Sequence, residues 1–222
     1  MKLTIVGATG GVGAHLLDQA VAANHDVTAV VRNPSRLPTP GEPGAPARVV
    51  TADLTSAAPN AAFTTAIAGA DAVLSALGPR HRSEDGVVSL GTRRIVDAMQ
   101  VAGVRRLVLV SVAGIAMTAD DRPDAGAGWF TRTMLSRIAR ARLAHHYADI
   151  AETHRSLRHT DLDWTTVGCP LLTNGPATGR YRTALDQSVR GGWRITRADA
   201  ATCLLATLNQ ADTVRHCVAI AH

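Results

Sequence analysis

Short apolar runs alternate along the chain with segments in which apolar residues recur every three or four positions. The runs are rich in Val, Ile and Leu, which is typical of strands buried on both faces, whereas the longer segments have the period of an amphipathic helix. The runs predict strands at residues 3–7, 26–32, 48–54, 71–77, 104–111, 162–170 and 215–221. The periodic segments predict helices at residues 14–24 and 86–103, and helical spacing returns from Phe130 onward.

This order of strand, helix and strand predicts an α/β fold, namely a Rossmann-type, doubly wound parallel sheet with helices on both faces. The 222 residues are sufficient for one well-buried core, so residues 1–222 are expected to form a single domain. The Pro/Gly-rich stretch at residues 38–47 reads as a surface loop. In such a sheet, ligands bind at the C-terminal ends of the strands.

Charge and cysteine content narrow the class of protein. The formal charge is +5, but the arginines are scattered among Asp and Glu, so no nucleic-acid partner is expected. No apolar run approaches the length of a membrane span, and the chain enters a strand at once without a leader. Cys169, Cys203 and Cys217 are odd in number and lack metal-ligand spacing. We therefore expect a cytoplasmic protein without disulfides, a metal site or a membrane partner.

The first strand runs into the sequence "GATGGVG", in which Gly7, Gly10 and Gly13 follow a GxxGxxG spacing. Gly7 suits a tight turn, Gly10 allows the backbone to approach a diphosphate, and Gly13 permits close packing of helix on strand. A strand before the motif and an amphipathic helix after it supply the context that the motif requires. The stretch predicts a dinucleotide-binding loop, the alternative being a glycine-rich turn without a ligand.

Two arginines follow the second strand, where an enzyme specific for NAD commonly has an acidic residue. Arg32 ends that strand, and the Asn33-Pro34 turn can bring Arg36 to the same anion. Guanidinium groups suit the 2′-phosphate that distinguishes NADPH from NADH. Two exposed arginines in an arginine-rich protein are the alternative interpretation.

Further residues at strand ends are candidates for the same ligand. Asp53 and Leu54 end the third strand, where they can meet an adenine, and Leu77 and Gly78 end the fourth, near the ribose and nicotinamide. In both places a simple strand-ending turn is an equally good interpretation.

Several stretches together resemble one known family. "GATGGVG", "VVRNPSRL", "ADL", "LGPR", "GTRRIVDAMQVAGVRRLVLVS" and "THRSLRHTDLDWTTV" are similar to the atypical short-chain dehydrogenase/reductases of the NmrA-like, NAD(P)H-binding group, and within it to the biliverdin-IX-beta (flavin) reductases. The resemblance spans residues 3–205 and implies a Rossmann fold, NADPH as hydride donor and a planar conjugated acceptor. It implies that cofactor is bound by Gly7, Thr9, Gly10, Val12, Gly13, Arg32, Arg36, Asp53, Leu54, Leu77 and Gly78. It places Ser111 and His154 at the nicotinamide and the substrate pocket.

The catalytic pair of the broader superfamily is missing. Tyr147 is followed four residues later by Ala151, where a Tyr-xxx-Lys pair has its lysine, and the only lysine is Lys2. Tyr147 is therefore not expected to act as a proton donor. Hydride transfer to a flavin or quinone needs mainly orientation, so Ser111 can hydrogen-bond the reactants and His154 can supply a proton, or both can be purely structural.

The segment at residues 115–146 differs most from the family pattern. It suggests a lid in which Trp129 and Phe130 stack on a planar substrate, or else a surface helix or a dimer contact. Asp199 is expected to be the N-cap of a last helix.

Three functions remain open from the sequence. The first is an NADPH-dependent reductase of a flavin, quinone or other planar molecule, working as a monomer or homodimer. The second is a regulator that binds NADP(H) without turning it over. The third is a tailoring ketoreductase, isomerase or cyclase of secondary metabolism on the same fold.

Overall fold

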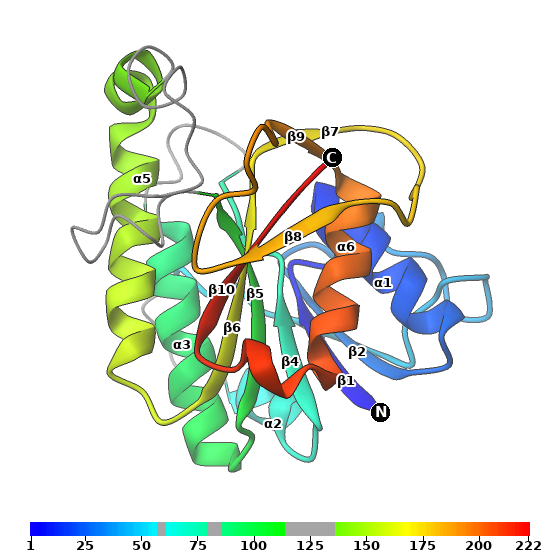
Figure 1. Ribbon diagram of the computed structural model, residues 1–222. Helices are drawn as coiled ribbons and strands as arrows, with labels where there is room; N and C mark the ends of the chain where they lie inside the picture. Colours follow the sequence, from blue (N-terminus) through cyan, green and yellow to red (C-terminus); the bar gives the residue numbers. More distant parts are fainter. Residues whose placement is uncertain (57–60, 80–85, 114–135) are drawn as a thin grey trace.

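A computed structural model describes residues 1–56, 61–79, 86–113 and 136–222, with the backbone alone for residues 136–146. Within these residues, eight strands form one sheet in the order β3-β2-β1-β4-β5-β6-β10-β8 (Figure 1). Every neighbouring pair is parallel except β10 and β8, which pair antiparallel. The strands are β1 (Lys2–Val6), β2 (Asp26–Val31), β3 (Arg48–Thr51), β4 (Ala72–Ser75), β5 (Arg106–Val112), β6 (Asp163–Cys169), β8 (Arg182–Leu185) and β10 (His216–Ala221).

Helices cover both faces of this sheet, so the predicted Rossmann-type α/β fold is confirmed. Figure 1 shows α1 and α6 on one face and α3 and α5 on the other. The helices are α1 (Gly11–Ala22), α2 (Ala61–Ile67), α3 (Val87–Ala102), α5 (Ser136–Arg158) and α6 (Arg197–Ala206), with 3-10 turns at η1 (Pro34–Arg36), η3 (Thr207–Asn209) and η4 (Ala211–Thr213). None of the helices in the described residues has the length and apolarity needed to cross a membrane.

Alternation along the strands creates two buried cores. Leu3 and Ile5 of β1 face α1 and α6 and belong to the same cluster as Leu16 and Leu204 of those helices. Val6 of the same strand belongs to the opposite cluster, which includes Ile95 of α3. Successive strand residues point to opposite faces, so a strand of continuous Val, Ile and Leu supplies both cores.

Helix α3 shows how local sequence sets the ends of an element. Gly86 before it and Gly103 after it both adopt the left-handed conformation, with φ of 76° and 70°. Glycine reaches this conformation without steric cost. The predicted range of 86–103 therefore agrees closely with the observed helix.

The other predicted strands are present with small differences in length. The third strand is the clearest correction, since β3 ends at Thr51 and residues 52–54 lie beyond it. Helix α2 was not predicted, and neither was a small parallel sheet of β7 (Leu171–Thr173) and β9 (Arg194–Thr196), which Figure 1 shows above the C-terminal ends of the large sheet. These elements are short, and pattern alone identifies short elements poorly.

The strand order reverses between β1 and β4, and the candidate site lies at this reversal. From β1 the chain proceeds outward to β2 and β3, then returns to β4 on the other side of β1. The loops after β1 and β4 diverge there and leave a crevice at the C-terminal edge of the sheet. The backbone hydrogen bond from Ala76 N to Val6 O, 2.9 Å long, marks the floor of this crevice.

Candidate functional site

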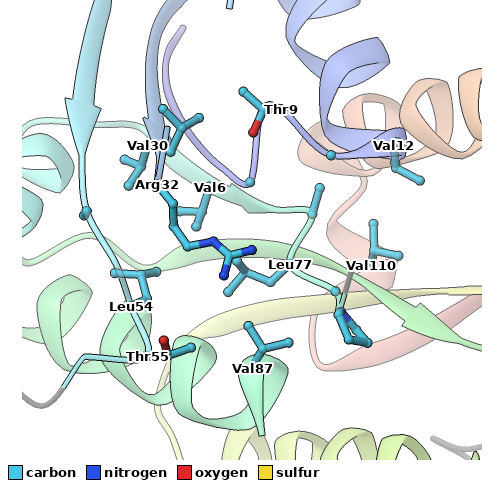
Figure 2. Close-up of a pocket in the computed structure, with 18 of the residues that line it drawn as sticks. Val6, Thr9, Val12, Val30, Arg32, Leu54, Thr55, Leu77, Val87 and Val110 are labelled. Carbon is cyan, nitrogen blue, oxygen red and sulfur yellow. The ribbon is translucent and has the colours of Figure 1, made fainter. Parts of the chain in front are cut away.

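An open groove of about 240 Å³ lies at this reversal. Its lining comes from the loop after β1 and the start of α1, the ends of β2, β3 and β4, Val110 of β5, the start of α3, and Leu172 and Arg197 from the last third of the chain. Figure 2 shows the side chains around it, with Val6, Val30, Leu54, Leu77, Val87 and Val110 giving apolar walls and Arg32 pointing into the space.

The glycine loop forms one end of the groove, and close contacts require a glycine at two of its positions. Gly7 has a φ of 80°, and a Cβ there would lie 2.9 Å from the carbonyl oxygen of Ala76. A Cβ on Gly13 would lie 2.0 Å from the oxygen of Gly7, so only glycine lets α1 pack this closely on the loop. Gly7 and Gly10 line the groove, whereas Gly13 lies behind them. The turn and packing functions predicted for Gly7 and Gly13 are confirmed.

The first turn of α1 opens toward the groove without a side-chain cap. Its N-cap is Gly10, which has extended backbone geometry and no side chain to accept a hydrogen bond from the helix amides. Gly11 and Val12 at the start of the helix line the groove, as does Thr9 before it. Uncapped amides and the positive end of the helix dipole together favour an anion at this point.

The two predicted arginines lie in different surroundings. Arg32 follows β2 and lines the groove, and Figure 2 shows its side chain extending from the strand end into the middle of the space. Arg36 lies on η1, is exposed and is not among the lining residues. Asn33 turns the chain here by accepting a hydrogen bond from Ser35 N at 3.0 Å. Arg32 is thus the one of the pair that the fold presents to a ligand in the groove.

Asp53 lines the groove, but its carboxylate makes hydrogen bonds within its own turn. Its Oδ1 accepts hydrogen bonds from the Thr55 amide at 2.9 Å and the Thr55 hydroxyl at 2.7 Å. Those bonds, with a smaller contribution from the charge of Arg32, hold the pKa of the Asp53 carboxyl below its ordinary value. Asp53 is therefore ionised at neutral pH. It shapes the loop that presents Leu54 to the groove.

The turn after β4 forms the facing wall. Leu77, Gly78 and Pro79 all line the groove. Leu77 packs tightly against α3, because a Cβ on Gly91 would lie 2.5 Å from its Cδ1. A Cβ on Gly78 would meet no atom within 4 Å, so this glycine borders open space.

Ser111 and His154 are brought together, although 42 residues of chain separate them. Ser111 Oγ and His154 Nε2 are 2.7 Å apart, and the two residues are 5% and 2% exposed. Burial lowers the pKa of His154 to about 4, so its imidazole is neutral at pH 7. Neither residue lines the groove, but Val110, the neighbour of Ser111 on β5, does. A neutral histidine suits the positioning of the Ser111 hydroxyl better than the predicted donation of a proton near neutral pH.

Helix α5 also holds the start of α3. The buried carboxylate of Asp149 accepts hydrogen bonds from Val88 N at 3.0 Å and Ser89 N at 2.8 Å. Because Gly86 supplies no side-chain cap, Asp149 takes its place from another element. Val87, at this helix start, lines the groove, so Asp149 supports that wall.

No lysine can complete a pair with Tyr147. Ala151 follows it at the required spacing, and Lys2 begins β1 at the opposite end of the sheet from the groove. The Lys2 amide is bonded there to Asp71 at 2.7 Å.

Arg197, which the sequence did not single out, lies at the rim of the glycine loop. It is the first residue of α6, lines the groove, and donates from Nη1 to Asn174 Oδ1 at 2.7 Å and to Leu172 O at 3.3 Å. Nothing in the local sequence marks it, since the residues it meets are far away along the chain.

The prediction that Asp199 is the N-cap of the last helix is wrong. Thr196 is the N-cap of α6, its hydroxyl accepting from the Asp199 amide at 3.0 Å. Asp199 is fully buried and accepts hydrogen bonds from Thr178, Gly179, Thr196 and His222. Burial opposes ionisation of this carboxyl, but the hydrogen bonds outweigh it and lower its pKa. Asp199 thereby ties the loop after β7 to α6.

Most of the segment predicted as a lid lies outside the described residues. Residues 114–135, including Trp129 and Phe130, lie outside the described residues, and only the backbone is described for residues 136–146.

The described groove fits a nicotinamide dinucleotide. Its glycine loop leaves no space for a Cβ at Gly7, its helix N-terminus is uncapped, and its cations are Arg32 and Arg197. The apolar walls suit the flat faces of adenine and nicotinamide. Arg32 follows the end of β2. A carboxylate at this position would repel a 2′-phosphate, whereas the guanidinium of Arg32 would attract it.

Comparisons with known proteins agree with this geometry. The sequence profile of the NAD(P)H-binding family matches residues 7–211. The UPF0659 protein YMR090W of Saccharomyces cerevisiae is 27% identical over 216 residues, which cover 94% of this chain and 87% of that protein.

Two solved structures have the same fold over the whole of this chain. ChuY, an anaerobillin reductase from Escherichia coli O157:H7, superposes with a TM-score of 0.73 and 24% identity and is covered to 97%. A short-chain dehydrogenase/reductase of Veillonella parvula in complex with NADP superposes with a TM-score of 0.73 and 17% identity, covered to 94%. The family profile confirms the predicted NAD(P)H-binding family, and the two solved structures show that the chain shares their fold.

Proposed function

Because this chain belongs to the NAD(P)H-binding family, we propose that it is an NADPH-dependent oxidoreductase that transfers a hydride to a planar conjugated acceptor such as a flavin, a quinone or a linear tetrapyrrole. The observation that carries the cofactor choice is the Arg32 side chain in the groove at the end of β2. A guanidinium makes charge-assisted hydrogen bonds to a phosphate, and NADH has no phosphate at that position.

Bound NADPH supplies the hydride, and the residues of the chain bind and orient it. The uncapped amides at Gly11 and Val12 face the diphosphate, Arg32 the 2′-phosphate, and Leu54 and Leu77 the flat rings. Val110 and Leu172 exclude water from the apolar walls nearest β5 and β7. This arrangement favours hydride transfer, because the reaction depends chiefly on orientation and exclusion of solvent.

The proposed acceptor class is supported by the groups available for proton donation. No Tyr-Lys pair is available to protonate a carbonyl oxygen, and His154 is neutral with a pKa of about 4. A conjugated acceptor spreads the incoming charge and takes its proton from water. The neighbour ChuY, a reductase of anaerobillin, provides an example of such chemistry on this fold.

The first test measures the dissociation constants of NADPH and NADH by fluorescence titration, for the wild type and for Arg32→Met and Arg36→Met. We expect R32M to weaken NADPH binding about ten- to hundredfold and to leave NADH unchanged, since one charge-assisted contact contributes about 1.5–3 kcal/mol. R36M is the matched control on the exposed turn. Equal affinities of the wild type for the two cofactors would refute the preference.

The second test offers NADPH with FMN, menadione or biliverdin and follows absorbance at 340 nm. Turnover with at least one acceptor is expected. Tight NADPH binding without any turnover would instead support the dinucleotide-binding regulator.

A further inference from the structure

Gly11, the second glycine of the "GG" pair in the loop, is not part of the GxxGxxG spacing. A contact in the structure nevertheless explains why this position is a glycine. A Cβ on Gly11 would lie 2.7 Å from Nε and 2.8 Å from Cδ of Arg197. The Arg197 side chain therefore lies directly over the first residue of α1. Two elements at opposite ends of the chain meet at the point where the helix amides are uncapped.

Arg197 is held in this place by neutral groups. Its Nη1 donates to the side-chain oxygen of Asn174 and to the carbonyl of Leu172. Among the ion pairs that the structure describes, none involves Arg197. The nearby carboxylate of Asp199 is already occupied by Thr178, Gly179, Thr196 and His222.

The charge of Arg197 lies against the positive end of an uncapped helix. Arg197 is the first residue of α6, and its guanidinium also lies over the N-terminus of α1. The uncapped α1 dipole presents its positive end there and opposes a positive charge, whereas at α6 the carboxylate of Asp199 in the first turn compensates the dipole. An anion bound in the groove beside Gly11 and Arg197 would attract both the guanidinium and the positive end of the α1 dipole, and would so offset the repulsion between them.

We propose that Arg197 binds the diphosphate of the dinucleotide, next to the first turn of α1. The inference rests on the proposed function, because it assigns a residue to the same groove. The two arginines then bind different parts of the cofactor, Arg32 the 2′-phosphate and Arg197 the diphosphate. Since Arg197 is anchored to Asn174 and Leu172, the bound diphosphate also fixes the segment after β6 that lines the acceptor end of the groove.

The test measures dissociation constants of three ligands by isothermal titration calorimetry. NADPH has both the diphosphate and the 2′-phosphate, NADH has only the diphosphate, and adenosine 2′-monophosphate has only the 2′-phosphate. Arg197→Met keeps the aliphatic contact over Gly11 and removes the charge. We expect R197M to weaken NADPH and NADH about tenfold each and to leave adenosine 2′-monophosphate unchanged.

Arg32→Met should give the opposite pattern, with NADPH and adenosine 2′-monophosphate weakened and NADH unchanged. Arg93→Met, on the exposed side of α3, is the matched control for loss of one positive charge. The contact with Asn174 is tested by Asn174→Ala, which leaves the Arg197 charge in place and should retain more NADPH affinity than R197M.

Normal binding of NADPH and NADH by R197M would overturn the assignment of Arg197 while the proposed function stands. Equal weakening of all three ligands would also overturn it, because a general distortion of the groove would then be the cause. A wild type that binds neither dinucleotide would overturn the proposed function itself.

Discussion

Replacement of Gly13 by alanine tests whether close packing of α1 on the glycine loop supports both the fold and the site. The new Cβ would lie 2.0 Å from the Gly7 oxygen, 2.8 Å from the Gly7 carbonyl carbon and 3.1 Å from the Ala8 Cα. These are backbone atoms in a loop that is also bonded to Val30 through the Gly7 amide at 3.0 Å. The helix must therefore move away from the strand by more than an ångström.

The expected magnitude combines two opposing effects. Overpacking of this kind costs about 1–3 kcal/mol, and the rigid backbone at this site argues for the upper end. Alanine is favoured over glycine within a helix by about 1 kcal/mol. The net loss of unfolding free energy is about 2 kcal/mol. For a chain of this size it corresponds to a decrease in melting temperature of about 4–8 °C.

The assay is thermal unfolding followed by circular dichroism, with NADPH titration of the same samples. Gly13→Ala should melt earlier and bind NADPH more weakly, because the α1 amides are displaced from the groove. Gly78→Ala is the matched control for stability, since its Cβ would meet no atom within 4 Å. A Gly13→Ala protein that melts within 2 °C of the wild type and binds NADPH normally would refute the reasoning.

The remaining predictions concern helix α5. The pKa of His154 is lowered from 6.5 to about 4, so the unfolded chain binds the extra proton between these pH values. Stability from this residue is therefore full above pH 6.5 and is lost as the pH falls toward 4, by up to about 3 kcal/mol. Urea unfolding at pH 7 and pH 4.5 should show this loss in the wild type and a smaller one in His154→Gln; identical pH dependence in both would contradict it. Asp149→Ala should lower the unfolding free energy by about 1–2 kcal/mol, because the amides of Val88 and Ser89 lose their acceptor. Asp149→Asn, which retains one acceptor oxygen, should lose less in the same assay, and an Ala variant as stable as the wild type would exclude the capping role.

Local pattern predicted the parts of the site that are made from contiguous sequence. The glycine loop, Arg32 after β2 and Leu77 and Gly78 after β4 all line the groove, because a parallel sheet brings the ends of successive strands to one edge. Arg36, which was predicted to bind the same phosphate, lies on η1 and does not line the groove, whereas Arg32 does. Sequence proximity does not fix the direction of a side chain in a turn.

Contacts between distant segments could not be predicted in this way. The hydrogen bond between Ser111 and His154 depends on how α5 packs against the sheet, and burial then makes the histidine neutral. The capping of α3 by Asp149 and the contact of Arg197 with Gly11 are likewise made between elements that no local signal connects.

The sequence by itself determined the α/β class, the glycine loop and the cationic end of β2, because each depends on residue type and on the periods of strand and helix. The tertiary structure alone decided the protonation of His154 and placed Arg197 over the start of α1. Burial and charge depend on what lies nearby in space, and in this fold those neighbours come from opposite ends of the chain.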